Sequence, residues 1–247
     1  MSQQSNDYIY GIRAVMEAIH SGKTIDKILL KKDSNGELYK ELFALIREKE
    51  INFQMVPSER LQRVTKNNHQ GAIAYLSPID YADFEMLVAE KMNQEGYTPL
   101  FLLLDRVSDV RNFGAIARSA EIAGVDAIIV PESGSARING EAVKTSAGAL
   151  HNIPLCKVKH LRDAIFTLQQ YGVKCIAASE KAQGFYYESD FTMPLGIIMG
   201  AEDKGVSPGI LKVVDERIAI PQKGKIQSLN VSAAAAVLLF DVVRQRG

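Results

Sequence analysis

The sequence predicts an α/β protein in which a small N-terminal α/β domain precedes a larger domain built on a mostly parallel sheet. Apolar runs of strand length alternate with helical stretches along most of the 247 residues. From residue 100 onward these runs are almost continuously apolar, which is typical of strands buried on both faces of a parallel sheet. An acidic stretch separates the two parts. We therefore expect domains at residues 1–77 and 97–247, joined by a linker at 78–96.

The first 77 residues alternate short strands with amphipathic helices. Helical spacing of apolar residues is clear at Leu38, Leu42 and Ile46, and Ser58 can cap a following helix. The expected strands lie at residues 8–10, 25–30, 53–56 and 72–76, and the expected helices at 12–19, 38–46 and 58–64.

The larger part repeats this alternation. The expected strands lie at residues 100–104, 127–130, 175–178, 195–199 and 217–220, and the expected helices at 112–123, 160–171 and 232–244. Within the linker, Phe84, Leu87 and Val88 suggest a short amphipathic helix. The last helix is rich in alanine, which would allow either close helix packing or a dimer interface.

The charge distribution does not by itself identify a partner. The chain carries 29 basic and 29 acidic residues, so its net charge is zero. Residues 1–77 and 97–247 are each +2, and the linker is −4. Domains this mildly basic can hold RNA through local patches, but charge alone does not argue for it.

Nothing in the composition indicates export, a membrane or a metal. Residues 1–7 are polar and lack the layout of a signal peptide, and no apolar run approaches the roughly 18 to 20 residues that span a bilayer. Cys156 and Cys175 are too few and too far apart for a disulfide framework or a zinc site, and the four histidines show no metal-ligand spacing. We expect a cytoplasmic protein with reduced core cysteines and no metal.

Three polar segments each follow a predicted strand, where ligands gather in open α/β sheets. The first contains Asn112 and Arg118, the second runs from Gly200 through Glu202 to Gly205, and the third is residues 228–232. Each also has a purely structural interpretation. Asn112 would be a helix cap and Arg118 a solvated residue, the glycine loop a tight turn, and Asn230 or Ser232 a second cap.

Together the segments resemble a known family. Asn112-x-Gly114-x-x-x-Arg118, Gly200-x-Glu202-x-x-Gly205 and Ser228-Leu229-Asn230-Val231-Ser232 look like the three successive motifs of the SpoU (TrmH-like) RNA 2′-O-methyltransferases. Residues 144–149 resemble the segment between the first two motifs. The similarity covers residues 97–247, and the N-terminal part resembles the ribosomal-protein-like RNA-binding domain of many members. The first motif usually has proline where this chain has Val110.

The resemblance implies a knotted (SPOUT-type) fold that binds S-adenosylmethionine, without a metal, in a homodimer. The family's cofactor contacts fall on Gly200, Ile220 and Leu229, and its catalytic positions on Arg118, Asn112, Glu202 and Asn230. Arg118 is assigned to activating the 2′-hydroxyl. Because guanidinium has a pKa above about 12, stabilising the developing oxyanion is physically easier for it than accepting a proton. Glu202 would orient Arg118 or form a structural ion pair.

The substrate implied is RNA, most closely a guanosine of large-subunit ribosomal RNA. Candidate phosphate contacts in the first domain are Arg13, Lys31, Lys32, Arg60, Arg63 and Lys66. Transfer RNA is an alternative, as is a non-catalytic RNA-binding or ribosome-assembly protein on the same fold. A dinucleotide-dependent oxidoreductase is disfavoured, because no glycine fingerprint follows a predicted strand.

Overall fold

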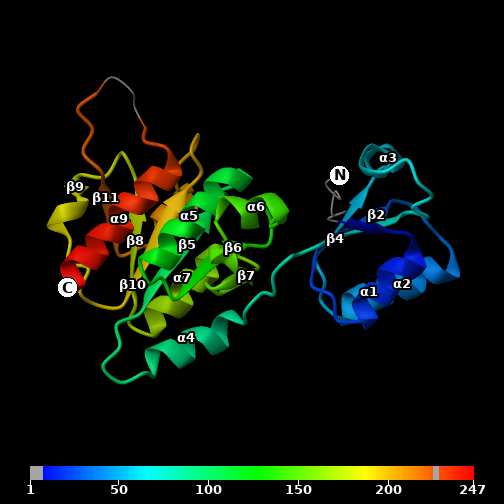
Figure 1. The fold of residues 1–247 in the computed structure, drawn as a ribbon, viewed down its shortest axis with the longest axis horizontal. Helices are drawn as coiled ribbons and strands as arrows, with labels where there is room; N and C mark the ends of the chain where they lie inside the picture. Colours follow the sequence, from blue (N-terminus) through cyan, green and yellow to red (C-terminus); the bar gives the residue numbers. More distant parts are fainter. Residues whose placement is uncertain (1–7, 225–227) are drawn as a thin grey trace. The chain divides into compact units, whose positions relative to one another are not determined.

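The computed structural model describes residues 8–224 and 228–247. Residues 1–7, the polar N-terminal segment, and residues 225–227, which precede the third motif in the sequence, lie outside the described residues. The chain forms two compact units, shown in Figure 1, and the main boundary between them falls between Asp80 and Tyr81, inside the expected linker.

The smaller unit is a four-stranded sheet with three helices. Its strands are β1 (Tyr8–Tyr10), β2 (Ile25–Lys31), β3 (Phe53–Val56) and β4 (Ala72–Leu76), and its helices are α1 (Ile12–His20), α2 (Glu37–Glu48) and α3 (Ser58–Val64). The strand order is β1-β4-β2-β3, with β4 antiparallel to both neighbours and β2 parallel to β3. All seven expected elements are confirmed to within two residues. The prediction that Ser58 caps the third helix is wrong, because Ser58 is the first residue of α3 and Pro57 precedes it at the cap position with no side-chain cap hydrogen bond.

Alternating residues of β2 pack into two separate cores, one on each face of the small sheet. Ile28 and Leu30 join a core with Val15 of α1 and Leu42 of α2. Leu29, between them, points to the opposite face and packs with Leu61 of α3. The period-two alternation of a strand therefore explains why one short apolar run supports helices on both sides.

The larger unit has a seven-stranded sheet. Its strands are β5 (Leu100–Asp105), β6 (Ala127–Pro131), β7 (Leu155–Val158), β8 (Lys174–Ala178), β9 (Gly184–Phe185), β10 (Leu195–Gly200) and β11 (Glu216–Ala219). The order is β7-β6-β5-β10-β8-β11-β9, and every described pairing between these strands is parallel. The parallel sheet predicted from the apolar runs is confirmed. Strands β7 and β9 were not expected, because they are short and lie at the two edges.

Helices cover both faces of this sheet. They are α4 (Phe84–Met92), α5 (Val110–Ile122), α6 (Gly140–Thr145), α7 (Leu161–Gln170), α8 (Pro208–Leu211) and α9 (Val231–Arg246), with 3-10 turns at η1 (Ala149–His151) and η2 (Tyr186–Glu188). Helices α4 and α7 share a core with Phe101, Leu103 and Ile198. Helices α5 and α9 pack against each other (Figure 1), and α9 also contacts β10.

Helix α4 shows that the acidic stretch is more than a connector. Val88 is fully buried in the core that α4 shares with α7, and Ala82 forms a parallel bridge to Cys156 of β7. Asp83 caps the helix by accepting a hydrogen bond from the backbone of Met86 at 2.8 Å. From Tyr81 onward the stretch is therefore part of the larger unit.

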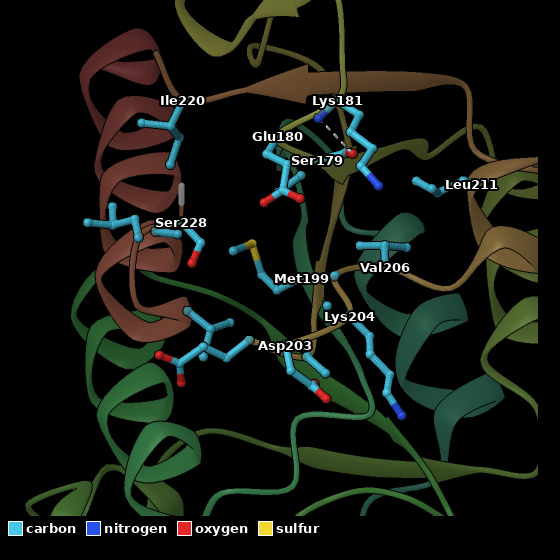
Figure 2. A pocket seen from close by; sticks show the side chains of 18 of the residues that line it. Ser179, Glu180, Lys181, Met199, Asp203, Lys204, Val206, Leu211, Ile220 and Ser228 are labelled. Carbon is cyan, nitrogen blue, oxygen red and sulfur yellow. Dashed lines mark hydrogen bonds between the residues drawn. The ribbon is translucent and has the colours of Figure 1, made fainter. Parts of the chain in front are cut away.

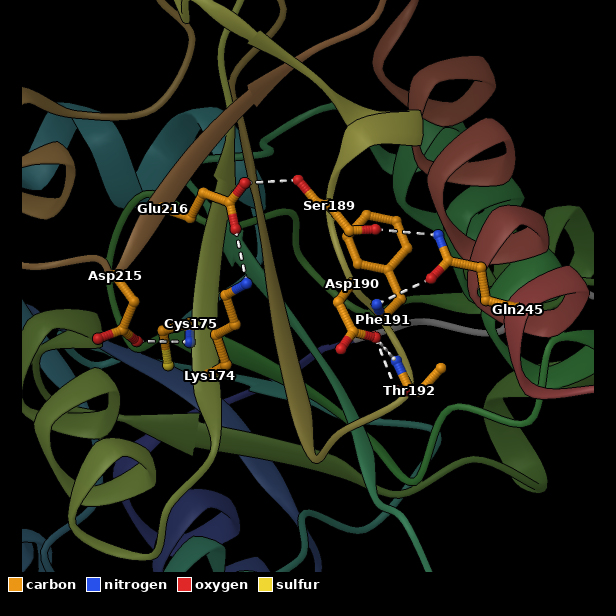
Figure 3. Close-up of polar contacts among 9 residues, drawn as sticks. All are labelled: Lys174, Cys175, Ser189, Asp190, Phe191, Thr192, Asp215, Glu216 and Gln245. Atoms are coloured by element: carbon orange, nitrogen blue, oxygen red, sulfur yellow. Dashed lines mark hydrogen bonds and ion pairs between the residues drawn. The ribbon is translucent and has the colours of Figure 1, made fainter.

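The C-terminal turn of α9 is fastened to the segments that lead into β5 and β10. Gln245 accepts a hydrogen bond from the backbone N–H of Phe191 at 2.9 Å and donates one to the carbonyl of Ser189 at 3.1 Å (Figure 3). Arg246 donates to the carbonyls of Thr98 at 2.7 Å and Met193 at 2.8 Å. These bonds hold the C-terminal end of α9 near the residues that precede β5 and β10.

The two cysteines are buried free thiols in β7 and β8. Burial, with a smaller contribution from Asp83 or Asp215, raises the pKa of Cys156 and of Cys175 to about 12. Both thiols stay protonated near neutral pH and serve as core residues. Within the described ranges, no helix is long and apolar enough to cross a membrane, and no group of His, Cys, Asp or Glu is arranged to hold a metal ion.

Candidate active site

The parallel register of β5 and β10 brings the first two polar segments together. Met199 lies opposite Leu104 and Gly200 opposite Asp105. The segments that follow β5 and β10 therefore leave the sheet side by side at its carboxyl end. The third segment ends at Asn230, where α9 begins. Residues far apart in the sequence therefore meet at the carboxyl end of the sheet.

Helix α5 begins at Val110, two residues earlier than expected. Its cap is Asp109, whose carboxylate accepts a hydrogen bond from the backbone N–H of Asn112 at 2.8 Å. The interpretation of Asn112 as the helix cap is thus wrong, because Asp109 satisfies that amide and leaves the Asn112 side chain available. Val110 occupies the first helical position, where proline is favoured because its missing N–H is not needed and its fixed φ suits the helix, but where other residues also fit. The departure from the usual motif therefore leaves the start of α5 intact.

Helix α9 is capped by Asn230. The side-chain oxygen of Asn230 accepts hydrogen bonds from the backbone N–H of Ser232 at 3.0 Å and of Ala233 at 3.4 Å, and from the Ser232 hydroxyl at 2.6 Å. Of the two caps considered from the sequence, Asn230 is the one found.

Three motif residues form one hydrogen-bonded chain. Asn230 Nδ2 donates to Asn112 Oδ1 at 3.0 Å, and Asn112 Nδ2 donates to Glu202 Oε2 at 3.0 Å. The cap of α9 fixes which group donates in each of these two hydrogen bonds. Since the Asn230 oxygen must accept from helix amides, its nitrogen faces Asn112, which leaves the Asn112 nitrogen to face Glu202. The chain therefore ends on a carboxylate that acts as an acceptor.

Arg118 does not join this chain. It lies six residues beyond Asn112 on α5 and is exposed. In the part of the chain that the structure describes, it makes no hydrogen bond or ion pair, and Glu202 pairs with Asn112 instead. The expected Arg118–Glu202 pair is therefore not present in a single copy of the chain.

A cavity of about 370 Å³ lies beside the chain of hydrogen bonds. Its wall comes from the end of β8, from β10 with its following loop, and from the segment before α9. Figure 2 shows Glu180, Met199, Lys204 and Ser228 around one opening. The expected cofactor positions Gly200, Ile220 and Leu229 all line it. Leu229 is an apolar side chain with 44% of its surface exposed, so it can contact a ligand.

Gly200 is required by the loop itself. A Cβ atom there would lie 2.0 Å from the carbonyl carbon of Gly205 and 2.1 Å from the nitrogen of Val206. The loop closes through a bridge in which the Gly205 N–H donates to the Ala201 carbonyl at 2.7 Å. The interpretation of this segment as a tight turn therefore holds at Gly200, where the missing Cβ admits the returning backbone.

Gly114 has a similar role on α5. A Cβ atom at this position would lie 2.7 Å from Thr145 Cβ and 2.9 Å from the carbonyl oxygen of Ala142. Helix α5 therefore packs its backbone against the end of α6. Thr145, in the segment of residues 144–149, therefore lies against the first motif.

Sequence reasoning missed one buried charged residue at this edge. Asp105 ends β5 with 5% of its surface exposed and accepts a hydrogen bond from the backbone N–H of Ser207 at 2.6 Å. An aspartate directly after an apolar run was the available indication. Ser179, Glu180 and Lys181, after β8, also line the cavity and carried no motif.

Comparison with known proteins follows the same division of the chain. The family model "SpoU rRNA Methylase family" matches residues 99–240, and the model "RNA 2'-O ribose methyltransferase substrate binding" matches residues 8–82. A Staphylococcus saprophyticus protein assigned to the TrmH family of tRNA/rRNA methyltransferases is 36% identical, covering 96% of this chain and 95% of its own. The Bacillus subtilis protein YacO, assigned to the same family, is 30% identical over 100% of this chain and 98% of its own.

Solved structures show the same fold. The AdoMet-bound rRNA methyltransferase of Sinorhizobium meliloti superposes with a TM-score of 0.61 at 23% identity, covering 96% of this chain and 86% of its own. The SpoU methyltransferase AviRb of Streptomyces viridochromogenes gives 0.61 at 22% identity, covering 97% and 89%. The A. aeolicus TrmH/SpoU tRNA modifying enzyme gives 0.56 at 28% identity, covering 66% and 82%.

The fold, the site and these matches define an RNA 2′-O-ribose methyltransferase. The SpoU methylase model covers more than half of the chain, and relatives above 30% identity extend over nearly all of it. The chain belongs to the SpoU (TrmH-like) methylase family.

Replacing Asn230 separates its two contacts. Asn230→Asp keeps the cap oxygen and removes the donor to Asn112, whereas Asn230→Ala removes both. We expect N230D to unfold with a free energy within about 0.5 kcal/mol of the parent and N230A to lose about 1 kcal/mol. Both variants should lower methyl transfer about tenfold or more, because Asn112 is no longer oriented toward Glu202. Thermal unfolding and single-turnover transfer measure the two effects. Full transfer by N230D would show that the Asn230–Asn112 bond is not needed.

Proposed function

We propose that this protein transfers the methyl group of S-adenosylmethionine to the ribose 2′-hydroxyl of a guanosine in large-subunit ribosomal RNA. The observation that carries the proposal is the hydrogen-bonded chain Asn230–Asn112–Glu202 beside a ligand-sized cavity. All three residues come from the family's motifs. Methyl transfer to a hydroxyl needs alignment of donor and acceptor, a stabilised oxyanion and no metal, and the side chains at this site suit those needs.

The cavity suits S-adenosylmethionine. A volume of about 370 Å³ is in the range of small-molecule sites, and the lining combines apolar Ile220 and Leu229 with backbone groups near Gly200. These three residues would hold the cofactor, and the cofactor when bound would supply an activated methyl group. The lining segments follow β8, β10 and β11, and we infer a trefoil knot around the cofactor from the resemblance to the family.

Each motif side chain has a role in this proposal. Glu202, held by Asn112, retains capacity to accept a hydrogen bond from the ribose, because a carboxylate accepts more than one. Asn112 and Asn230 keep that carboxylate in place. Arg118 would stabilise negative charge that develops on the 2′-oxygen, since its guanidinium stays protonated and is a poor base.

Ribosomal RNA is favoured by the extent of the structural matches. The rRNA methyltransferase of Sinorhizobium meliloti covers 96% of this chain, including the smaller unit. The tRNA modifying enzyme of A. aeolicus covers only 66% of it. An additional substrate-binding unit therefore accompanies the ribosomal RNA enzyme in this comparison. The assignment to guanosine rests on the resemblance of the motifs and the N-terminal unit.

The smaller unit offers a basic end for RNA phosphates. The backbone N–H of Lys31 donates to the carbonyl of Gly71 at 2.8 Å, and the Gln70 side chain accepts from the backbone N–H of Ile12 at 3.3 Å. The end of β2, the loop before β4 and the start of α1 therefore meet. Exposed cations at this end are Arg13, Lys31, Lys32 and Lys66. Arg60 and Arg63 are exposed on α3, and all six remain candidate phosphate contacts.

A second copy of the chain is the proposed partner of helices α5 and α9. These packed helices expose the large apolar side chains Ile122, Phe240 and Val243, with 61%, 46% and 39% of their surfaces accessible. Exposed apolar groups concentrated on two packed helices are typical of an interface. Arg118 lies on the same α5 helix, so a homodimer would place it beside the contact.

The reaction is tested with methyl-labelled S-adenosylmethionine and separate pools of unmodified ribosomal and transfer RNA. We expect label in one 2′-O-methylguanosine of large-subunit RNA. Arg118→Ala should lower transfer by about 100-fold or more while leaving cofactor affinity and thermal unfolding unchanged, and Arg118→Lys should retain part of it. Label in the transfer RNA pool would favour the tRNA alternative. Absence of both cofactor binding and label would favour a non-catalytic RNA-binding protein, and full transfer by R118A would remove Arg118 from the site.

The basic end of the smaller unit is tested by charge reversal. Lys31→Glu with Lys32→Glu should weaken RNA binding about tenfold in dilute salt and reduce the slope of log affinity against log salt by about 2, because two phosphate contacts are lost. Cofactor affinity should not change. The control is Lys23→Glu with Lys49→Glu, which makes the same charge change at exposed positions before β2 and after α2. Equal loss in both pairs would show that only overall charge matters.

The homodimer is tested by sedimentation equilibrium. The unaltered protein should sediment at twice the 27.2 kDa mass of one chain. Phe240→Glu should shift the protein to monomer, because a charge would be buried at the contact. Phe166→Glu is the matched control, since Phe166 is 39% exposed on α7, a helix outside the proposed interface. A monomeric parent, or equal dissociation by F166E, would contradict the interface.

A further inference from the structure

Two adjacent residues at the end of β5 hold the loop that follows β10. Asp105 Oδ2 accepts a hydrogen bond from the backbone N–H of Ser207 at 2.6 Å, and its Oδ1 pairs with Nε of Arg106 at 3.2 Å. Arg106 Nη2 donates to the carbonyl oxygen of Gly205 at 3.4 Å. The pair therefore reaches two points of the loop, and neither residue has a role in the proposed chemistry.

The conformation of Arg106 is unfavourable for its residue type. Its φ of 59° lies in the left-handed region, which residues other than glycine rarely adopt. The stem of the side chain passes closely over Gly134, where a Cβ atom would lie 3.4 Å from Arg106 Cγ. Such strain persists only when surrounding contacts favour it, and here those contacts are the bonds to Asp105 and Gly205.

The loop held in this way carries parts of both sites. Gly205 and Val206 line the cofactor cavity. Glu202 stands in the same loop and receives the hydrogen bond from Asn112. Arg106 itself lines a second hollow, of about 310 Å³, together with Asn112 and Glu202. Arg106 therefore lies between the strand that starts the first motif and the loop of the second.

We propose that Asp105 and Arg106 form a latch that holds residues 200–207 closed, so that the cavity is preorganised for the cofactor. Both are positioning residues, because their contacts are with Gly205 and Ser207 of the loop and neither residue lines the cofactor cavity. The proposal rests on the proposed function only in naming S-adenosylmethionine as the ligand. Without the latch the loop must be ordered when the ligand binds, and affinity falls by the cost of that ordering.

Arg106→Gly is the informative variant. Glycine adopts a φ near 59° without strain, so the substitution removes the guanidinium contacts while relieving the backbone. We expect R106G to bind S-adenosylhomocysteine about 5- to 10-fold more weakly in calorimetry, with a melting temperature equal to or above that of the parent. Arg106→Ala keeps the strain and loses the contacts, so it should show the same loss of affinity with a lower melting temperature.

Arg111→Ala is the matched control. Arg111 stands on α5, pairs with Glu141 at 3.0 Å and has a side chain that is 79% exposed, so its loss removes the same charge without touching the loop. Hydrogen–deuterium exchange without ligand supplies a second readout. The amides of Gly205 and Ser207 should exchange faster in R106G than in the parent, and at the parent rate in R111A.

The outcomes separate the latch from the proposed function. Faster exchange with weaker binding in R106G supports the latch. Unchanged exchange at residues 200–207 overturns it, whatever the ligand does. Faster exchange with unchanged affinity overturns its role in preorganising the cavity, and so does an equal loss of affinity in R111A. If the unaltered protein does not bind S-adenosylhomocysteine, the proposed function fails, and hydrogen exchange still decides whether the latch exists.

Discussion

The hydrogen bond that caps α9 determines the polarity of the whole site. A helix leaves its first four amides without partners in the helix, and here the oxygen of Asn230 accepts from two of them, those of Ser232 and Ala233. An amide side chain has one oxygen and one nitrogen, so committing the oxygen to the helix turns the nitrogen toward Asn112. Asn112 in turn can only donate toward Glu202. A structural requirement of the last helix thus sets which atoms the site presents to a substrate.

Close backbone contacts at two glycines position the elements that carry Asn112 and Glu202. Gly114 lets α5 lie against α6, and Gly200 lets the loop after β10 return against its own strand. In each case a Cβ atom would overlap backbone or a neighbouring Cβ, so the glycine is needed before any ligand is considered. The motif glycines therefore place Asn112 and Glu202 within hydrogen-bond distance by controlling the packing of the elements that carry them.

How far the sequence predicted the structure depended on how local each cause was. Apolar runs in the sequence predicted buried strands such as β5 and β10. Strands β7 and β9 were missed because they are short edge strands with little apolar pattern. The cap of α5 was misplaced because Asp109 and Asn112 are both good caps, and only the backbone decides between them. The motifs identified Asn112, Glu202 and Asn230, but the role of Asp105 depends on Ser207, which is 102 residues away. No periodicity could have revealed that contact.

Arg118 shows what a single copy of the chain leaves incomplete. Three of the four proposed catalytic residues are already joined, while Arg118 is exposed and, among the described residues, has no hydrogen-bond or ion-pair partner. A charged side chain left in water loses much of its electrostatic effect, because stabilisation of an oxyanion is strong only where water is excluded. The proposed role of Arg118 therefore requires another surface to cover it. In the proposed function RNA and a second copy of the chain would each supply such a surface, so the chemistry proposed for this site depends on assembly as well as on the fold.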